Sequence, residues 1–173
     1  MRLQMVGCSY HNAPVEKREK LAFDATQAGR ALDDLRARFP QTEAVLLSTC
    51  NRVEIYAHHP SPPSVLHDGL QRFLTTWHKI AQNDIGDAMY LFEDRDVVRH
   101  LFRVSSGLDS LVFGEGQILG QVHDAYEAAH IHHATDKVIS ALFQRAFAVA
   151  KRVRTQTQIG IGKVSVSSVA VDL

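Results

Sequence analysis

The sequence has little cysteine, no long hydrophobic run and no net charge. Its two cysteines, Cys8 and Cys50, are too few among 173 residues for a disulfide scaffold and fit a reducing compartment. No apolar run approaches the roughly 18 residues that span a bilayer, and the first residues show no signal-peptide pattern. We therefore expect a cytoplasmic protein with no membrane partner. A chain of this length, 45% hydrophobic, can form a core without disulfides or metals.

The charge is unevenly distributed, although 19 basic residues balance 19 acidic ones. Residues 1–136 hold 13 basic and 18 acidic side chains, whereas residues 137–171 hold six basic side chains and no acidic one. A basic stretch of this kind is typical of a surface that binds a polyanion such as nucleic acid. A solvated helix face explains it equally well, so both interpretations stay open.

Hydrophobic periodicity predicts an α+β fold. The first part has the order β, α, β, β, α, β, and its first helical region is split at Asp24, which forms a capping-box pattern with Gln27. This order indicates a ferredoxin-like βαββαβ sandwich, in which helices cover one face of a four-stranded antiparallel sheet. The expected strands cover residues 1–9, 43–48, 53–57 and 88–92, and the expected helices cover 15–23, 25–39 and 65–77.

A helical extension is expected after the sheet. Asp94 is expected to cap a helix that runs toward Gly107. Two further helices should follow, over residues 117–133 and 136–157. Residues 164–171 alternate like a strand but also continue a helical pattern, so their structure stays open. The expected organisation is a ferredoxin-like part over 1–93, a helical part over 94–157 and the start of a linker over 158–173.

Cys50 is the first candidate for chemistry. It lies at the tip of a predicted hairpin, after Thr49 and before Asn51 and Arg52. A neighbouring guanidinium lowers the pKa of a thiol and increases the thiolate fraction that attacks electrophiles. A lone cysteine is more often a buried, inert residue, which is our interpretation of Cys8. Arg52 is either a surface charge or a bidentate clamp for a substrate carboxylate.

Three other motifs contain residue types that carry chemistry in proteins. His100, on an amphipathic helix, is either a surface residue or the partner of a catalytic thiol, and spacing does not decide between these roles. Gly114 and Gly116 resemble half of a dinucleotide-binding motif, but Leu119 stands at the third glycine position and no parallel βαβ pattern surrounds them. A metal site is not expected from the nearby histidines, which are His130, His132 and His133.

Five sequence blocks together share a pattern with one known family. The most specific are S-T-C-N-R-x-E at residues 48–54 and H-L-F-R-V-x-S-G-L at residues 100–108. Three weaker blocks lie at residues 7–23, 114–122 and 148–155. With these blocks the chain resembles the N-terminal domain of the glutamyl-tRNA reductase family.

The resemblance implies an NADPH-dependent oxidoreductase. Members of this family reduce glutamate esterified to its tRNA, which gives glutamate-1-semialdehyde for tetrapyrrole (porphyrin) synthesis. The family's cysteine at the position of Cys50 attacks the ester and holds the glutamyl group as a thioester, and the histidine at the position of His100 is important for activity. A thioester accepts hydride more readily than an ester, so covalent capture divides one difficult step into two.

The resemblance also implies which residues bind the substrate. We expect Arg52 to bind a substrate carboxylate and Glu115 to attract the α-ammonium group. The family usually has proline where this chain has Gly116, and glycine would make the loop more flexible. The full implied set is Thr49, Asn51, Arg52, Ser110, Glu115, Gly116, Gln117 and Gln121.

In this family a nucleotide-binding domain and a dimerisation domain follow the catalytic one, and this chain stops before any further glycine-rich motif. We therefore expect a fragment that keeps the acylation site only, with NADPH bound by the absent domain. The implied partners are glutamyl-tRNA, a second copy of the full-length enzyme and the aminomutase that acts next. The alternatives are a non-enzymatic tRNA- or protein-binding module with a structural Cys50, and a stand-alone cysteine hydrolase.

Overall fold

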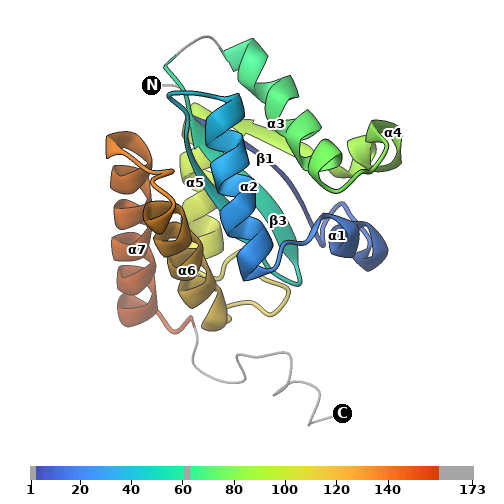
Figure 1. The fold of residues 1–173 in the computed structure, drawn as a ribbon. Coiled ribbons are helices and arrows are strands. Elements are labelled where there is room, and N and C mark those ends of the chain that lie inside the picture. The colour runs from blue at the N-terminus through green and yellow to red at the C-terminus, as the bar shows by residue number, and fades with distance from the viewer. Residues whose placement is uncertain (1–2, 61–62, 160–173) are drawn as a thin grey trace.

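Four strands and seven α-helices make up the part of the chain that the computed structural model describes, residues 3–60 and 63–159 (Figure 1). The strands are β1 (Leu3–Ser9), β2 (Glu43–Ser48), β3 (Arg52–His58) and β4 (Tyr90–Glu93). The helices are α1 (Val15–Leu21), α2 (Ala25–Arg38), α3 (Pro63–Trp77), α4 (Gln82–Ile85), α5 (Asp94–Ser105), α6 (Gln117–Ile131) and α7 (Lys137–Gln156), and a short 3₁₀ helix, η1 (Gly86–Ala88), precedes β4.

The sheet is antiparallel throughout, in the order β2-β3-β1-β4. β2 and β3 form the expected hairpin, whose register runs from Glu43 opposite His58 to Ser48 opposite Val53. β1 pairs with β3 along its whole length and with β4 on its other side. The predicted α+β class, the order of the elements and the antiparallel sheet are confirmed.

Helices cover both faces of the sheet (Figure 1). α2 and α3 lie against β2 and β1 on one face, whereas α5 and α7 pack together and contact β1 and β3 on the other. α6 runs alongside β2 and also contacts α2 and α7. The expectation of one covered face was incomplete, because the helical extension folds back onto the second face.

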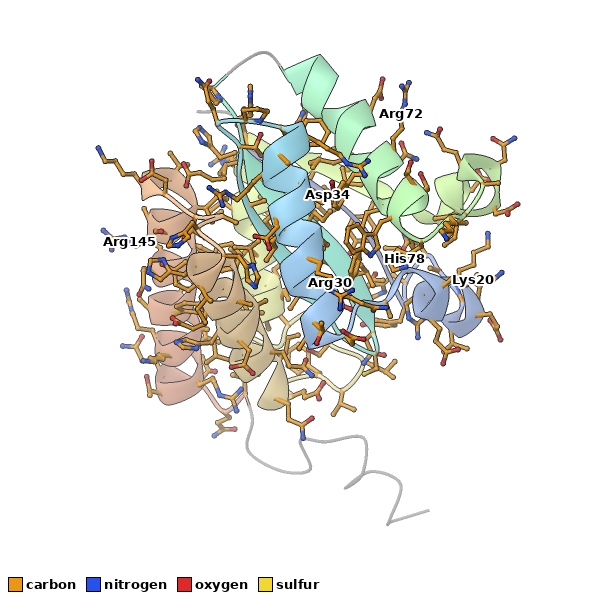
Figure 2. All side chains as sticks on the ribbon, in the orientation of Figure 1. Lys20, Arg30, Asp34, Arg72, His78 and Arg145 are labelled. Carbon is orange, nitrogen blue, oxygen red and sulfur yellow. The ribbon has the colours of Figure 1, made fainter. Side chains whose placement is uncertain are left out.

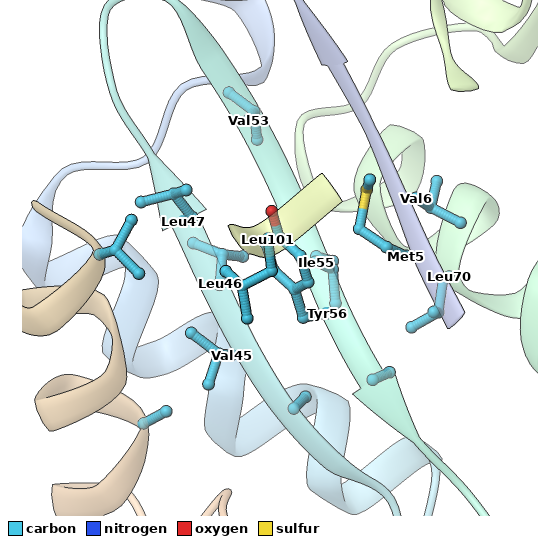
Figure 3. Packing of buried hydrophobic residues seen from close by; sticks show 14 of the residues in the cluster. Met5, Val6, Val45, Leu46, Leu47, Val53, Ile55, Tyr56, Leu70 and Leu101 are labelled. Atoms are coloured by element: carbon cyan, nitrogen blue, oxygen red, sulfur yellow. The ribbon is translucent and has the colours of Figure 1, made fainter. Parts of the chain in front are cut away.

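The core forms on both faces of the sheet, because helices cover each face. Every residue of β1 is buried, including Gln4, which the alternation of the sequence would have left to solvent. Successive residues of a strand point to opposite faces, so Met5 lies on the face of its partner Tyr56 and Val6 on the face of Ile55. Figure 3 shows these strand residues with Leu70 of α3 and Leu101 of α5, which belong to the same buried cluster.

Local sequence signals set most element boundaries. The capping box of α2 is present, with the Asp24 carboxylate accepting from the Gln27 N–H at 2.7 Å and the Gln27 side chain accepting from the Asp24 N–H at 3.0 Å. Asp94 does not cap α5 as expected, because Glu93 is the N-cap residue. The Asp94 carboxylate instead accepts from the Leu3 N–H at 2.9 Å and fastens the start of β1. The α4 and η1 turns were not expected, and residues 164–171 lie outside the described part.

Charged side chains of the helices project into solvent, as Lys20, Arg72 and Arg145 illustrate (Figure 2). Arg145 lies on α7, the helix that carries most of the basic stretch noted in the sequence. Within residues 3–60 and 63–159, no helix combines the length and apolar composition that a membrane span requires.

We predict that Gly7→Ala destabilises the fold by about 1–3 kcal/mol, the usual cost of overpacking a filled core. A Cβ at Gly7 would lie 2.8 Å from Cα and Cγ of Glu54 and closer still to the Val53 carbonyl oxygen, and backbone atoms of a paired strand cannot move aside. Urea unfolding measures the change. The matched control is Gly120→Ala on α6, where nothing lies within 4 Å, so an equal loss there would contradict the prediction.

Candidate active site

Cys50 is exposed at the tip of the β2–β3 hairpin, and a set of backbone contacts holds the turn around it. The Thr49 N–H donates to the Arg52 carbonyl at 2.8 Å, and the Thr49 hydroxyl accepts from the N–H groups of Asn51 and Arg52 at 3.2 Å each. Arg18 of α1 donates from Nε to the Cys50 carbonyl at 3.2 Å. The thiol is therefore carried on an ordered turn and remains open to a substrate.

Cys8, the second thiol, lies inside β1 and is fully buried. Burial raises the pKa of its thiol to about 11. A thiol that stays protonated and has no access to solvent cannot act as a nucleophile. The structure thus supports the interpretation of Cys8 as an inert core residue.

Arg52 is almost completely buried, at 1% exposure, so its interpretation as a surface charge was wrong. Its Nη1 lies 2.9 Å from Oε1 of Glu54, and its Nη2 lies 3.0 Å from Oδ2 of Asp109. Nη2 also donates to the main-chain carbonyl of Asp109. Arg52 thereby joins the base of the hairpin to the loop that follows α5.

Glu54 is the centre of the buried polar network, and the sequence analysis did not single it out. Its Oε1 accepts from Arg52 and, at 2.5 Å, from the Tyr90 hydroxyl, while Oε2 accepts from the Tyr56 hydroxyl at 2.6 Å. Burial alone would raise the pKa of Glu54, but the Arg52 charge and the bonds from His100 and Tyr56 lower it to about 2. The available signal was the spacing of Arg52, Glu54 and Tyr56, which places three polar groups on one face of a buried strand.

His100 projects from α5 into this network. Its Nε2 lies 2.8 Å from Oε1 of Glu54, its ring packs against Tyr56, Tyr90 and Phe92, and its side chain is only 11% exposed. The surface interpretation of His100 was therefore wrong. Among the described residues no hydrogen bond joins His100 to Cys50, and the two are connected through β3, which carries Arg52 and Glu54 after the hairpin tip.

The loop between α5 and α6 carries most of the other expected site residues. Asp109, which binds Arg52, stands directly before Ser110, while Glu115 and Gly116 lead into Gln117, the first residue of α6. Arg154 of α7 donates from Nη1 to the Glu115 carbonyl at 3.3 Å. Asp109 and Arg154 are thus two anchors of this loop that sequence reasoning missed.

Gly116 adopts φ −78°, a conformation open to any residue and close to that of proline. A Cβ at this position would lie 2.9 Å from Nη2 of Arg154, the mobile end of a long side chain. The backbone therefore does not require glycine here, and the Arg154 guanidinium lies over the space that a larger residue would fill.

Gln121 lies apart from that loop, on the second turn of α6. It lines a cavity of about 240 Å³ together with Ser48, the residue at the end of β2 that leads into the hairpin turn. The Ser48 hydroxyl accepts from the Phe23 N–H at 2.9 Å, which fixes that wall. A larger cavity, of about 450 Å³, lies at the opposite end of the hairpin around Glu43 and His58, away from Cys50.

The residues described contain no group of three or more His, Cys, Asp or Glu side chains placed to hold a metal ion. His132 bonds instead to Asp33, with Nδ1 and Oδ1 3.0 Å apart. Gly114 and Gly116 follow a loop and lead into α6, and the sheet contains no parallel strands. Gly114 and Gly116 therefore do not form a Rossmann-type dinucleotide motif.

Comparison with known proteins finds relatives along the whole chain. The family model described as "Glutamyl-tRNAGlu reductase, N-terminal domain" matches residues 6–157. The chain belongs to the glutamyl-tRNA reductase family. The glutamyl-tRNA reductase of Marinobacter nauticus is 45% identical over 175 residues, covering 100% of this chain and 40% of the relative. That of Stenotrophomonas maltophilia is 46% identical over 173 residues, covering 100% of this chain and 38% of the relative.

A solved glutamyl-tRNA reductase, from Methanopyrus kandleri, has the same fold, with a TM-score of 0.80 and 35% identity. The match covers 98% of this chain and 38% of that one. The chain thus spans about 40% of the length of the glutamyl-tRNA reductases it matches. The expected membership in this oxidoreductase family is confirmed.

We predict that Glu54 makes the free energy of unfolding decrease as the pH falls. A carboxylate with its pKa lowered to about 2 in the folded chain, against 4.5 ordinarily, contributes stability that is complete above pH 4.5 and is lost as the pH falls toward 2. The loss from this group should be about 3 kcal/mol over that window. Urea unfolding at a series of pH values measures it.

Glu54→Gln should remove this part of the slope of the free energy of unfolding against pH. It should also weaken the fold at neutral pH, because it leaves the buried Arg52 without its partner. The control is Asp34→Asn, which breaks the more exposed ion pair with Arg38 and should keep the wild-type slope. A Glu54→Gln curve parallel to wild type between pH 4.5 and 2 would refute the assignment.

Proposed function

We propose that this chain carries the acylation site of a glutamyl-tRNA reductase, with Cys50 as the nucleophile. Its thiolate attacks the carbonyl carbon of glutamate esterified to the tRNA, a C–S bond forms, and the C–O bond to the ribose breaks. The ribose oxygen leaves with a proton from water, and the glutamyl group remains as a thioester on Cys50. The observation that carries the proposal is the exposed thiol on an ordered turn in a chain of this family.

The expected substrate residues are proposed to surround the glutamyl group. Thr49 and Asn51 belong to the hairpin turn, Arg52 begins β3, and the others lie on the loop before α6 or on α6 itself. The contact between Arg52 and Asp109 supports this grouping, because it ties the turn to the loop. The proposed set is Thr49, Asn51, Arg52, Ser110, Glu115, Gly116, Gln117 and Gln121.

His100 is proposed to act beside the reacting ester as an orienting group. Its bond to Glu54 fixes the ring and leaves Nδ1 as the nitrogen available to another partner. Arg52, which belongs to the same network, is proposed to bind a substrate carboxylate. In this proposal the buried carboxylate of Glu54 holds the side chains of His100 and Arg52 in position.

The thioester is proposed to be reduced by hydride from NADPH. This step is proposed to need the part of the full-length relatives that the chain does not cover. The proposed pathway is tetrapyrrole synthesis from glutamate. The full-length enzyme is proposed to form a homodimer, to have the next-acting aminomutase as a partner and to be located in the cytoplasm. The strand order β2-β3-β1-β4 supports the ferredoxin-like assignment of residues 1–93, followed by the helical part over 94–157.

We predict that incubation with glutamyl-tRNA adds one glutamyl group to the wild-type chain, which intact-mass spectrometry detects. Cys50→Ala should form no adduct, because the attacking sulfur is gone. Cys8→Ala should form the adduct normally, because the Cys8 thiol is buried in β1 and cannot reach a substrate. The adduct should then decay by hydrolysis without reduction.

An adduct that survives in Cys50→Ala would contradict the mechanism. A wild-type chain that binds charged and uncharged tRNA equally and forms no adduct would instead support a non-enzymatic tRNA-binding module. Salt-dependent binding alone does not distinguish these outcomes, since phosphate contacts produce it in both.

A further inference from the structure

The loop after α5 exposes two large hydrophobic side chains. Leu111 is 56% exposed and Phe113 is 66% exposed, whereas most large apolar residues of the described chain are buried or half-buried. Of the other strongly exposed ones, Val15 begins α1 and Ile131 ends α6. An exposed aromatic next to an apolar neighbour is a common feature of binding surfaces.

The backbone that carries this pair is well fixed. The Gly114 N–H donates to the Gly107 carbonyl at 2.9 Å and closes the loop, and the Glu115 N–H donates to the Val112 carbonyl at 3.1 Å. Side chains of two other elements hold its ends, through the bonds of Arg52 to Asp109 and of Arg154 to Glu115. Phe113 is therefore presented to solvent by an ordered scaffold.

The same contacts place the loop beside the nucleophile. Arg52, which binds Asp109, is two residues from Cys50, and His11 lies 3.6 Å from Asp109. The Tyr10 N–H, next to His11, donates to the Asn51 carbonyl at 2.9 Å in the hairpin turn. The loop and the hairpin thus form one continuous surface.

Cations flank this surface. Arg103 of α5 lies 3.8 Å from Asp109 and is 54% exposed. Lys151 is exposed on α7 one helical turn before Arg154, which bonds the loop, and Arg152 is exposed on the same helix. Proteins that bind single-stranded nucleic acid combine exposed cations with aromatic side chains on which bases stack.

We propose that Phe113, with Leu111 beside it, is the stacking site for the terminal adenine of glutamyl-tRNA. The inference rests on the proposed function. An aminoacyl ester joins the amino acid to the terminal ribose, so the adenine on that ribose must lie next to the carbonyl that Cys50 attacks. Stacking on an aromatic side chain stabilises an unpaired base and needs no matching hydrogen-bond pattern.

The test uses uncharged tRNA whose terminal adenine is replaced by 2-aminopurine, a base whose fluorescence falls when it stacks. The wild-type chain should quench the fluorescence. Phe113→Leu should abolish the quenching and weaken binding on the order of tenfold at fixed salt, whereas Phe113→Trp should retain both. The control is Ile131→Ala, which removes an exposed apolar group about 20 Å away at the other end of α6 and should change neither.

The acylation assay separates this inference from the proposed function. A normal Cys50 adduct, with quenching equal in wild type and Phe113→Leu, would overturn the stacking site and leave the function intact. Absence of the adduct in wild type would count against the proposed function, while quenching that depends on Phe113 would still support the stacking site. A wild-type dimer that Phe113→Leu dissociates, without quenching in either, would assign the patch to self-association and overturn the proposal.

Discussion

The buried ion pair of Glu54 and Arg52 is the interaction on which the rest of this structure depends. A carboxylate in the interior is tolerated only when its charge is neutralised and its oxygens are hydrogen-bonded. Here Arg52 supplies the charge, while Tyr56, Tyr90 and His100 occupy the oxygens. Removing any one partner leaves the others with unsatisfied groups away from water. The network therefore behaves as a unit and fixes the relative positions of β3, β4 and α5.

The network exists because a glycine leaves room for it. Gly7 on the central strand is paired with Glu54 on one side and with Tyr90 on the other, so the three residues form one row across the sheet. With no side chain at the middle position, the Glu54 side chain can lie over the strand and the Tyr90 hydroxyl can reach its carboxylate. The requirement at Gly7 is thus for space, and it couples the packing of the sheet to the geometry of the site.

Much of the fold was predictable from the sequence, because its boundaries are set locally. The capping box at Asp24 and the hairpin around Cys50 depend on residues close together in the chain, and both are present. The sequence left a surface position open for Arg52 and His100, because some of the partners that hold them in the interior are distant in sequence. Glu54 lies 46 residues from His100, and Asp109 lies 57 residues from Arg52. Only the folded chain shows that these polar residues share one interior cluster.

The buried pairing also limits the acidic charge that the protein exposes near its site. Glu54 is neutralised inside the protein by Arg52, and Asp109 is 13% exposed and shares the same guanidinium. One of these two negative charges is therefore neutralised inside the protein. The exposed charges nearby have both signs: Arg103 and, at the end of α7, Lys151 and Arg152 are basic, whereas Asp24 and Asp124 beside the cavity of Gln121 are acidic. Internal pairing of Glu54 thus removes one acidic charge that would otherwise repel a polyanion next to the exposed thiol.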